Sequence, residues 1–200
     1  MRTVAALIFM IFNLGFAAVG YAAGGDVTVI KGKDKEDGSD IRGFRVSSED
    51  EQAYLFFLCD SDRQRPQIMI THRHVIGKRT DPFKVYYQID SNDEQRHWFL
   101  VRGSGRTGYF FVRFPIEYKR RFGDQPPSFK EDGSAVNQEY IKWDQGIYAT
   151  VVHDFLSGSN ALVRIHDKQE KDHLYAFSLK GLADKAPEIA SCYDPSLVKE

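Results

Sequence analysis

Short β-type runs follow one another at close spacing between residues 41 and 114, and no other feature limits the fold of this chain as strongly. Each run is rich in β-branched and aromatic residues and ends in a polar turn. This pattern is typical of antiparallel strands that are connected as hairpins or as a meander. The expected strands lie at 41–46, 53–59, 67–75, 83–89, 97–101 and 109–114.

Two of these runs differ in their apolar pattern. The run 53–59 (AYLFFLC) is continuously apolar, which predicts a strand that is buried on both faces. The run 67–75 (QIMITHRHV) alternates instead, so that His72 and His74 share one face with Ile68.

The chain between residues 151 and 192 combines helical and β-type patterns. The whole chain therefore predicts an α+β fold in a single domain, with an antiparallel β-sheet (hairpins or a meander) and two C-terminal helices. About 175 residues remain after the export signal, which is enough for one substantial core. The expected C-terminal elements are a helix ending at Ser157, strands at 161–166 and 173–179, and a helix closing on Cys192.

Residues 1–22 have the three parts of a secretory signal peptide. Arg2 supplies an early positive charge, an apolar stretch follows, and small residues precede the expected cleavage site after Ala22. Cleavage after Ala23 is disfavoured, because it would place bulky Tyr21 where the signal requires a small side chain.

An uncleaved membrane anchor is the alternative, since the apolar stretch approaches the roughly 20 residues that span a bilayer. Asn13 and the small residues that follow it favour cleavage. The expected product has no membrane span, and it resides in the periplasm of a Gram-negative bacterium or is secreted from it.

Residues 23–40 are expected to form a flexible linker, because 31–40 (KGKDKEDGSD) contains no apolar residue to bury. The β-type stretch at 26–30 is either an edge strand or the end of the leader. The folded domain is expected to span 41–200. Within it, 123–139 is predicted as a long loop, since Gly, Pro and polar residues dominate that stretch.

The chain contains two cysteines, Cys59 and Cys192. In an oxidising compartment an even pair indicates a disulfide bond, which here would connect an early strand to the last helix. Closing so long a loop stabilises a fold by about 4–5 kcal/mol through the entropy of the unfolded chain. The alternative is two separate buried thiols, because free cysteine is among the most buried residue types.

The formal net charge is −1, and loss of Arg2 with the signal makes it one unit more negative. The mature chain therefore has no net basic field to attract nucleic acid or anionic lipid. The basic cluster at 119–121 is too small for a nucleic-acid interface. The expected partners are proteins of the cell envelope, with small ligands as the alternative.

No catalytic motif stands out in the sequence. Residues 103–108 (GSGRTG) match G-x-G-x-x-G, but the residues that follow are β-type and not helical. The stretch therefore predicts a glycine-rich hairpin turn and not a dinucleotide site. A G-x-S-x-G nucleophile motif is absent. We expect a protein that is not an enzyme and that needs no cofactor.

His72 and His74 lie on one strand face, a spacing that suits a metal ion if a third ligand approaches. The alternative is that both histidines lie where the core meets solvent. Two other histidines, His97 and His173, are expected at the surface or rim. The candidates for the third ligand are His97, His153 and His166.

Aromatic residues gather on neighbouring expected strands, and alternation turns half of them to each face. They are either core residues or, on the exposed half, part of a recognition surface. Arg164 follows two apolar residues, so it is either paired with a carboxylate such as Asp90 or an ordinary exposed strand residue. The candidate partner-binding residues are Arg164, Asp167, Asp90 and Trp98.

Several motifs occur in a fixed order over roughly residues 53–193. They are a β-run ending in Cys59, the segment 85–90 (VYYQID), Trp98, Phe155-Leu156, 162–164 (LVR), 177–182 (FSLKGL) and Cys192. In this order the chain resembles the VasI-like (TagO-like) periplasmic accessory proteins of type VI secretion systems. The resemblance implies an accessory protein without known catalysis, and it supplies no catalytic residues.

These observations predict an exported periplasmic accessory or binding protein, associated with type VI secretion, that is not an enzyme. The alternative is an envelope hydrolase or a metal-binding protein that uses His72 and His74.

Overall fold

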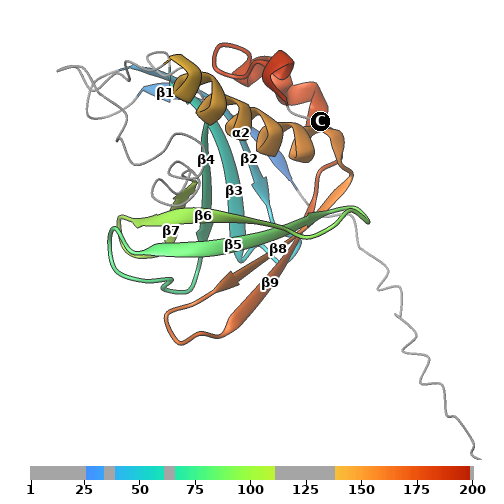
Figure 1. Ribbon diagram of the computed structural model, residues 1–200. Coiled ribbons are helices and arrows are strands. Elements are labelled where there is room, and N and C mark those ends of the chain that lie inside the picture. Colours follow the sequence, from blue (N-terminus) through green and yellow to red (C-terminus); the bar gives the residue numbers. More distant parts are fainter. Residues whose placement is uncertain (1–25, 34–38, 61–65, 111–137, 199–200) are drawn as a thin grey trace, which may run out of the picture.

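The computed structural model describes residues 26–33, 39–60, 66–110 and 138–198 (Figure 1). The predicted export signal and most of the predicted loop at 123–139 lie outside these residues. In the described part of the chain, no helix combines the length and the apolar character needed to cross a bilayer.

Within the described residues, one antiparallel sheet has nine strands in the order β1-β2-β3-β4-β7-β6-β5-β8-β9. Each strand alternates its side chains between two faces, and one face forms the core. The strands are β1 Val27–Lys33, β2 Asp40–Ser47, β3 Ala53–Asp60, β4 Gln67–His72, β5 Pro82–Ile89, β6 Gln95–Arg102, β7 Thr107–Phe110, β8 Asn160–His166 and β9 Asp172–Ser178.

The antiparallel sheet and its strands are predicted correctly, with differences at their ends. β4 ends at His72 and not at residue 75, and β7 begins at Thr107. The last part of the run at 109–114 lies outside the described residues. β1 forms within the range that was expected to be a linker, and it pairs along its whole length with β2.

The helical prediction needs a correction. Helix α2, Gln138–Ser157, ends at the predicted residue but precedes β8, so the helices do not both follow the sheet. After β9 the chain forms two 3-10 segments, η2 Ala183–Ile189 and η3 Pro195–Leu197, in place of the predicted α-helix. Pro187 lies inside η2 and removes a backbone donor, which disfavours a continuous α-helix there. The described chain is predominantly sheet.

The sheet is strongly curved. β5 and β6 run across the direction of β3 and β4, and α2 lies over the sheet (Figure 1). The ring of Phe155 on α2 lies 5.3 Å from the ring of Phe57 and 5.0 Å from that of Tyr87, so the helix contacts both halves of the sheet. The first and last parts of the curved sheet also meet directly: the backbone N–H of Glu49, between β2 and β3, donates to the carbonyl of Ala176 on β9.

The prediction for the apolar run 53–59 is wrong about its second face. Leu55, Phe57 and Cys59 are buried, whereas Tyr54 and Phe56 are only half-buried. The guanidinium of Arg45 lies 5.2 Å from the ring centre of Tyr54 and partly covers this outer face. A strand with helix packing on one side needs only one fully apolar face.

Cys59 and Cys192 form the predicted disulfide, with their Cα atoms 5.8 Å apart. The bond attaches the segment after η2 to β3. Leu182, which precedes η2, and Ile189, its last residue, are fully buried, so the C-terminal part of the chain belongs to the core.

Candidate functional site

A cluster of titratable side chains lies where the end of β4 meets the β8–β9 hairpin. Alternation along β4 places His72 on the core face, and the same rule along β9 places His173 and Tyr175 on that face. β7, β6, β5 and β8 separate the two strands in the sheet. The curvature of the sheet therefore brings these side chains together. We call His72, His74, Asp167, His173 and Tyr175 the histidine cluster.

The rings of the cluster lie close to one another. His74 and His173 are stacked with their centroids 4.1 Å apart, and the ring of His72 lies 5.9 Å from each of them. His72 is 2% exposed, and its Nδ1 lies 3.0 Å from the hydroxyl of Tyr175. Its Nε2 is buried and has no hydrogen-bond partner within the described chain.

Asp167 is fixed by the turn that connects β8 and β9. Its Oδ1 accepts hydrogen bonds from the backbone N–H groups of Gln169 and Lys171, at 2.8 and 3.0 Å. Its Oδ2 lies 2.8 Å from Nε2 of His173. The turn also touches the segment after β4, because the backbone N–H of Lys168 donates to the carbonyl of Val75.

Burial and neighbouring charges shift the pKa values of the cluster. Burial, with smaller contributions from His173 and His74, lowers the pKa of His72 to about 4. Burial and the neighbouring His173 also lower the pKa of His74. The hydrogen bond from His173 lowers the pKa of Asp167 to about 2. At neutral pH the imidazoles of His72 and His74 are therefore neutral, and the carboxylate of Asp167 is ionised.

The three expected third ligands lie elsewhere. His97 stacks on Tyr87 with the ring centroids 5.5 Å apart, and burial lowers its pKa to about 4. His153 contacts the hydroxyl of Tyr193 at 3.4 Å, and His166 pairs with Asp172.

His173 and Asp167 are the residues that join His74. The sequence placed His173 at the rim and assigned Asp167 to partner binding. Their positions in the sequence could have indicated that they lie close together: Asp167 directly follows β8, and His173 is the second residue of β9.

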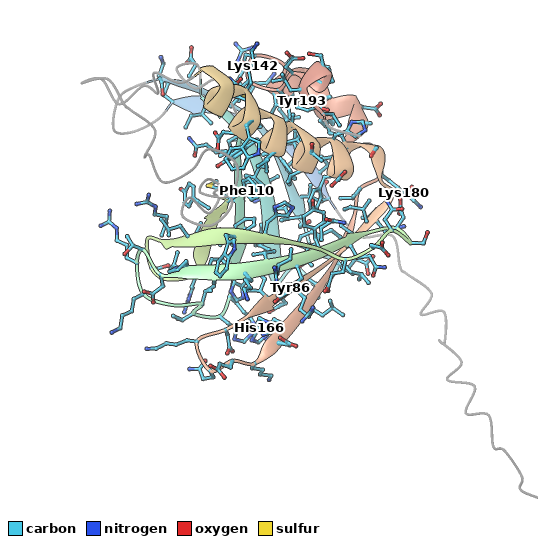
Figure 2. The ribbon with its side chains drawn as sticks, in the orientation of Figure 1. Tyr86, Phe110, Lys142, His166, Lys180 and Tyr193 are labelled. Atoms are coloured by element: carbon cyan, nitrogen blue, oxygen red, sulfur yellow. A yellow bond between two sulfur atoms is a disulfide. The ribbon has the colours of Figure 1, made fainter. Side chains whose placement is uncertain are left out.

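Arg164 lies on the outer face of the sheet, opposite the core. Its guanidinium lies 4.2 Å from the ring centre of Tyr86 and makes hydrogen bonds of 2.7–3.3 Å to both oxygens of Glu94. Of the two alternatives for Arg164, the pairing with a carboxylate is present, but the partner is Glu94 and not Asp90. Tyr86 also meets His166 edge to face on this surface (Figure 2).

Asp90 and Trp98 have separate positions. The carboxylate of Asp90 accepts hydrogen bonds from the backbone N–H groups of Ser159 and Asn160, at 2.9–3.2 Å, and so connects the end of β5 to the start of β8. Trp98 lies on the outer face, where the ammonium of Lys84 is 5.2 Å from its ring centre. These two residues do not meet the histidine cluster.

The glycine-rich stretch forms a hairpin turn, as predicted: residues 103–106 connect β6 to β7, and Thr107 and Gly108 begin β7. Gly105 has a φ of +82°, and a Cβ at this position would lie 2.5 Å from the carbonyl oxygen of Gly77. Gly105 therefore permits a close approach of two backbone segments that any larger residue would prevent.

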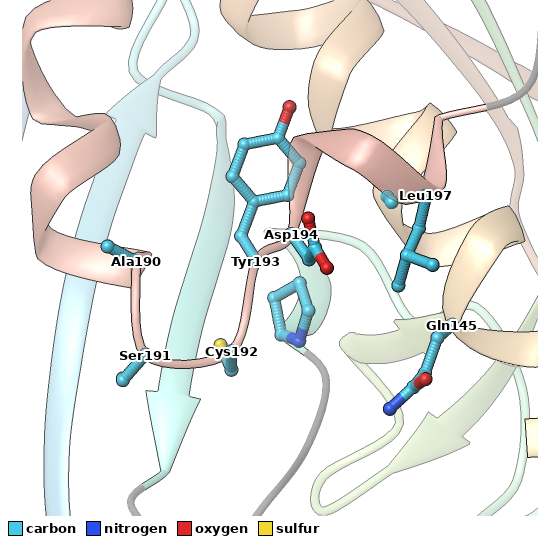
Figure 3. A pocket seen from close by; sticks show the side chains of 9 residues that line it. Gln145, Ala190, Ser191, Cys192, Tyr193, Asp194 and Leu197 are labelled. Carbon is cyan, nitrogen blue, oxygen red and sulfur yellow. The ribbon is translucent and has the colours of Figure 1, made fainter. Parts of the chain in front are cut away.

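A hollow of about 230 Å³ lies beside the disulfide, between α2 and the C-terminal segment (Figure 3). The carboxylate of Asp194 in its wall accepts hydrogen bonds from the backbone N–H and hydroxyl of Ser196. This carboxylate is thus used to cap η3. The hollow is lined by Pro66, Gln145, Ala149, Ala190, Ser191, Cys192, Tyr193, Asp194 and Leu197.

Comparison of the chain with protein-family models, with curated proteins and with solved structures gave no significant match.

Proposed function

We propose that this protein is an exported, non-enzymatic accessory protein of the Gram-negative cell envelope that binds a protein subunit of a type VI secretion system. The Cys59–Cys192 bond supports an oxidising location, because disulfides persist in the periplasm and outside the cell. The order of sequence motifs over 53–193 supports the association with secretion.

One observation on the outer face of the sheet is the main support for binding to a protein partner. Arg96, Tyr86, Arg164 and Leu174 are successive cross-strand neighbours, so their side chains form one continuous row on this face. We call these four residues the outer row. Leu174 is 63% exposed. Glu94 and Tyr86 hold the Arg164 side chain in place, so a partner would meet an ordered surface.

Ordered arginine and tyrosine side chains beside an exposed apolar residue are the composition that protein interfaces favour. Immobilising a flexible side chain costs about 0.5–1.5 kcal/mol on association. Arg164 has already lost much of this freedom through its two contacts. The row therefore fits a protein partner better than it fits nucleic acid.

Chemical crosslinking in the envelope of the native host, with the exported protein as bait, tests this role. We expect wild type to recover membrane subunits of the secretion machine, and Leu174→Asp to lose them. Val75→Asp is the matched control, because Val75 is also an exposed apolar residue but lies outside the outer row. Recovery of only abundant envelope proteins by wild type would contradict the accessory role.

The histidine cluster favours a second candidate function, namely a metal-binding protein or a metal-dependent envelope hydrolase. Two imidazoles beside a carboxylate are a common donor set for zinc. Metal content after purification without a chelating resin tests this second candidate, since it requires stoichiometric metal.

A further inference from the structure

Three side chains of the histidine cluster have the geometry of a metal site. His74, Asp167 and His173 each offer one donor atom, and these atoms lie within 4.8 Å of one another. Donors of a tetrahedral zinc ion are about 3.4 Å apart, given bond lengths near 2.1 Å. A side-chain movement on the order of 1 Å closes this difference.

The backbone around these three residues is already in place. Asp167 is anchored through Oδ1 by two backbone N–H groups, which leaves Oδ2 directed at His173. Anchoring of a ligating carboxylate by a second set of hydrogen bonds is a regular feature of metal sites. The bond from Lys168 to Val75 holds the turn against the segment that carries His74. Neither segment has to be reordered to bring the ligands together.

His72 independently indicates that an ion binds at this place. Its side chain is 2% exposed, it lies beside both ligand histidines, and its Nε2 has no hydrogen-bond partner among the described residues. A buried unsatisfied nitrogen costs about 1–3 kcal/mol. A metal ion at the neighbouring site, with a bound water in its open coordination position, would give this nitrogen a partner.

The two histidine ligands can be reached from solvent. His74 and His173 are half-buried, which leaves the ion a path from solvent.

We infer that His74, Asp167 and His173 form a binding site for a late first-row divalent metal ion, zinc(II) or copper(II). Imidazole nitrogen favours these ions, whereas calcium and magnesium require oxygen ligands. Three protein ligands leave one coordination position open. The site goes beyond the accessory role and does not depend on it. It differs from the pair expected from the sequence, since His72 lies behind the site and His173 takes its place.

Arg73 opposes metal binding in this arrangement. Its Nε–H donates to Nε2 of His74 at 3.0 Å, and its positive charge lies next to the site. The side chain is exposed and is free to move into solvent. Arg73→Ala removes a competing donor and a repulsive charge, so it is expected to raise metal affinity severalfold.

Calorimetric titration of the metal-free mature protein with zinc chloride tests the site. We expect one ion per chain, and affinity at least tenfold weaker in His74→Ala and His173→Gln. His166→Ala is the matched control, because His166 is a half-buried histidine that precedes the same turn but contacts Tyr86 on the outer face. Asp167→Asn keeps an oxygen for the backbone bonds and is expected to weaken binding without unfolding the turn.

Copper(II) electron paramagnetic resonance supplies a readout that stability alone would not change. The nitrogen hyperfine pattern is expected to indicate two imidazole ligands in wild type and one in His74→Ala. Circular dichroism of each metal-free variant verifies folding. Absence of stoichiometric zinc or copper binding, or equal affinity in wild type and His74→Ala, would overturn the proposal. Neither outcome bears on the accessory role, which the envelope crosslinking tests separately.

Discussion

Nδ1 of His72 and the hydroxyl of Tyr175 lie 3.0 Å apart, and their hydrogen bond joins β4 directly to β9 across the inside of the curved sheet. Four strands separate β4 from β9 along the sheet. Closure of the curve at this point therefore depends on a polar contact between side chains as well as on apolar packing.

Tyr175→Phe is expected to reduce the free energy of unfolding by about 1–3 kcal/mol, because it leaves a second nitrogen of buried His72 without a partner. Urea denaturation followed by circular dichroism measures this change. Tyr54→Phe is the control, since Tyr54 lies half-buried on the outer face. Equal losses in both variants would show that the contact does not stabilise the fold.

The Cys59–Cys192 bond closes a loop of 133 positions, so its removal is expected to cost about 4–5 kcal/mol of stability. The double variant Cys59→Ala, Cys192→Ala should unfold at a markedly lower urea concentration than the oxidised protein. Mass spectrometry of the non-reduced exported protein verifies the bond beforehand. Two free thiols in that spectrum would exclude it.

Stability is expected to fall as the pH drops from about 6.5 to about 4, because burial lowers the pKa of His97 to about 4 in the folded chain. The unfolded chain, with an ordinary histidine pKa, takes up this proton first. The contribution is therefore complete above pH 6.5 and is lost as the pH falls, by on the order of 2–3 kcal/mol. Unfolding free energies of wild type at pH 7.5, 5.5 and 4.5 measure the slope.

His97→Phe keeps an aromatic ring between Tyr87 and Phe110 but removes the titrating group. Its unfolding free energy should change less over the same pH range. His153→Phe is the control, because His153 is an exposed histidine of α2. A slope in His97→Phe as steep as in wild type would refute the assignment.

Asp90→Ala is expected to cost about 1–2 kcal/mol, since it removes the acceptor for the backbone N–H groups of Ser159 and Asn160. Asp90 also has a φ of +50°, a conformation that alanine adopts less readily than aspartate or asparagine. Asp90→Asn should therefore remain within about 0.5 kcal/mol of wild type. Asp93→Ala in the same turn is the control. Thermal unfolding that places Asp90→Ala level with Asp93→Ala would disprove this role.

Local residue patterns determined most of the strands. Alternation in 67–75 correctly placed His72 on the same face as Ile68, and the apolar runs correctly located β3, β5 and β8. The glycines at 103–108 correctly marked a hairpin turn. These features depend on backbone sterics and on side-chain direction, which act over a few neighbouring residues.

Predictions from local patterns were wrong where tertiary packing determines the burial, the conformation or the partner of a residue. The apolar run 53–59 did not indicate that one of its faces is half-buried, because burial depends on what covers the strand. The segment after β9 has helical character, but Pro187 and the packing around the disulfide favour a 3-10 conformation. The exact partner of Arg164 depended on the tertiary structure, which brings Glu94, the residue before β6, next to it.

The sequence by itself thus determined most of the strands, the cysteine pair and the face of β4 on which His72 lies. Only the tertiary structure decided that His173 and Asp167 lie next to His74, from which almost a hundred positions of the chain separate them. The approach depends on the strand order and on the curvature accumulated across the intervening strands. Each strand adds a small twist that no local pattern specifies, and the sum of these twists sets the distance between β4 and β9.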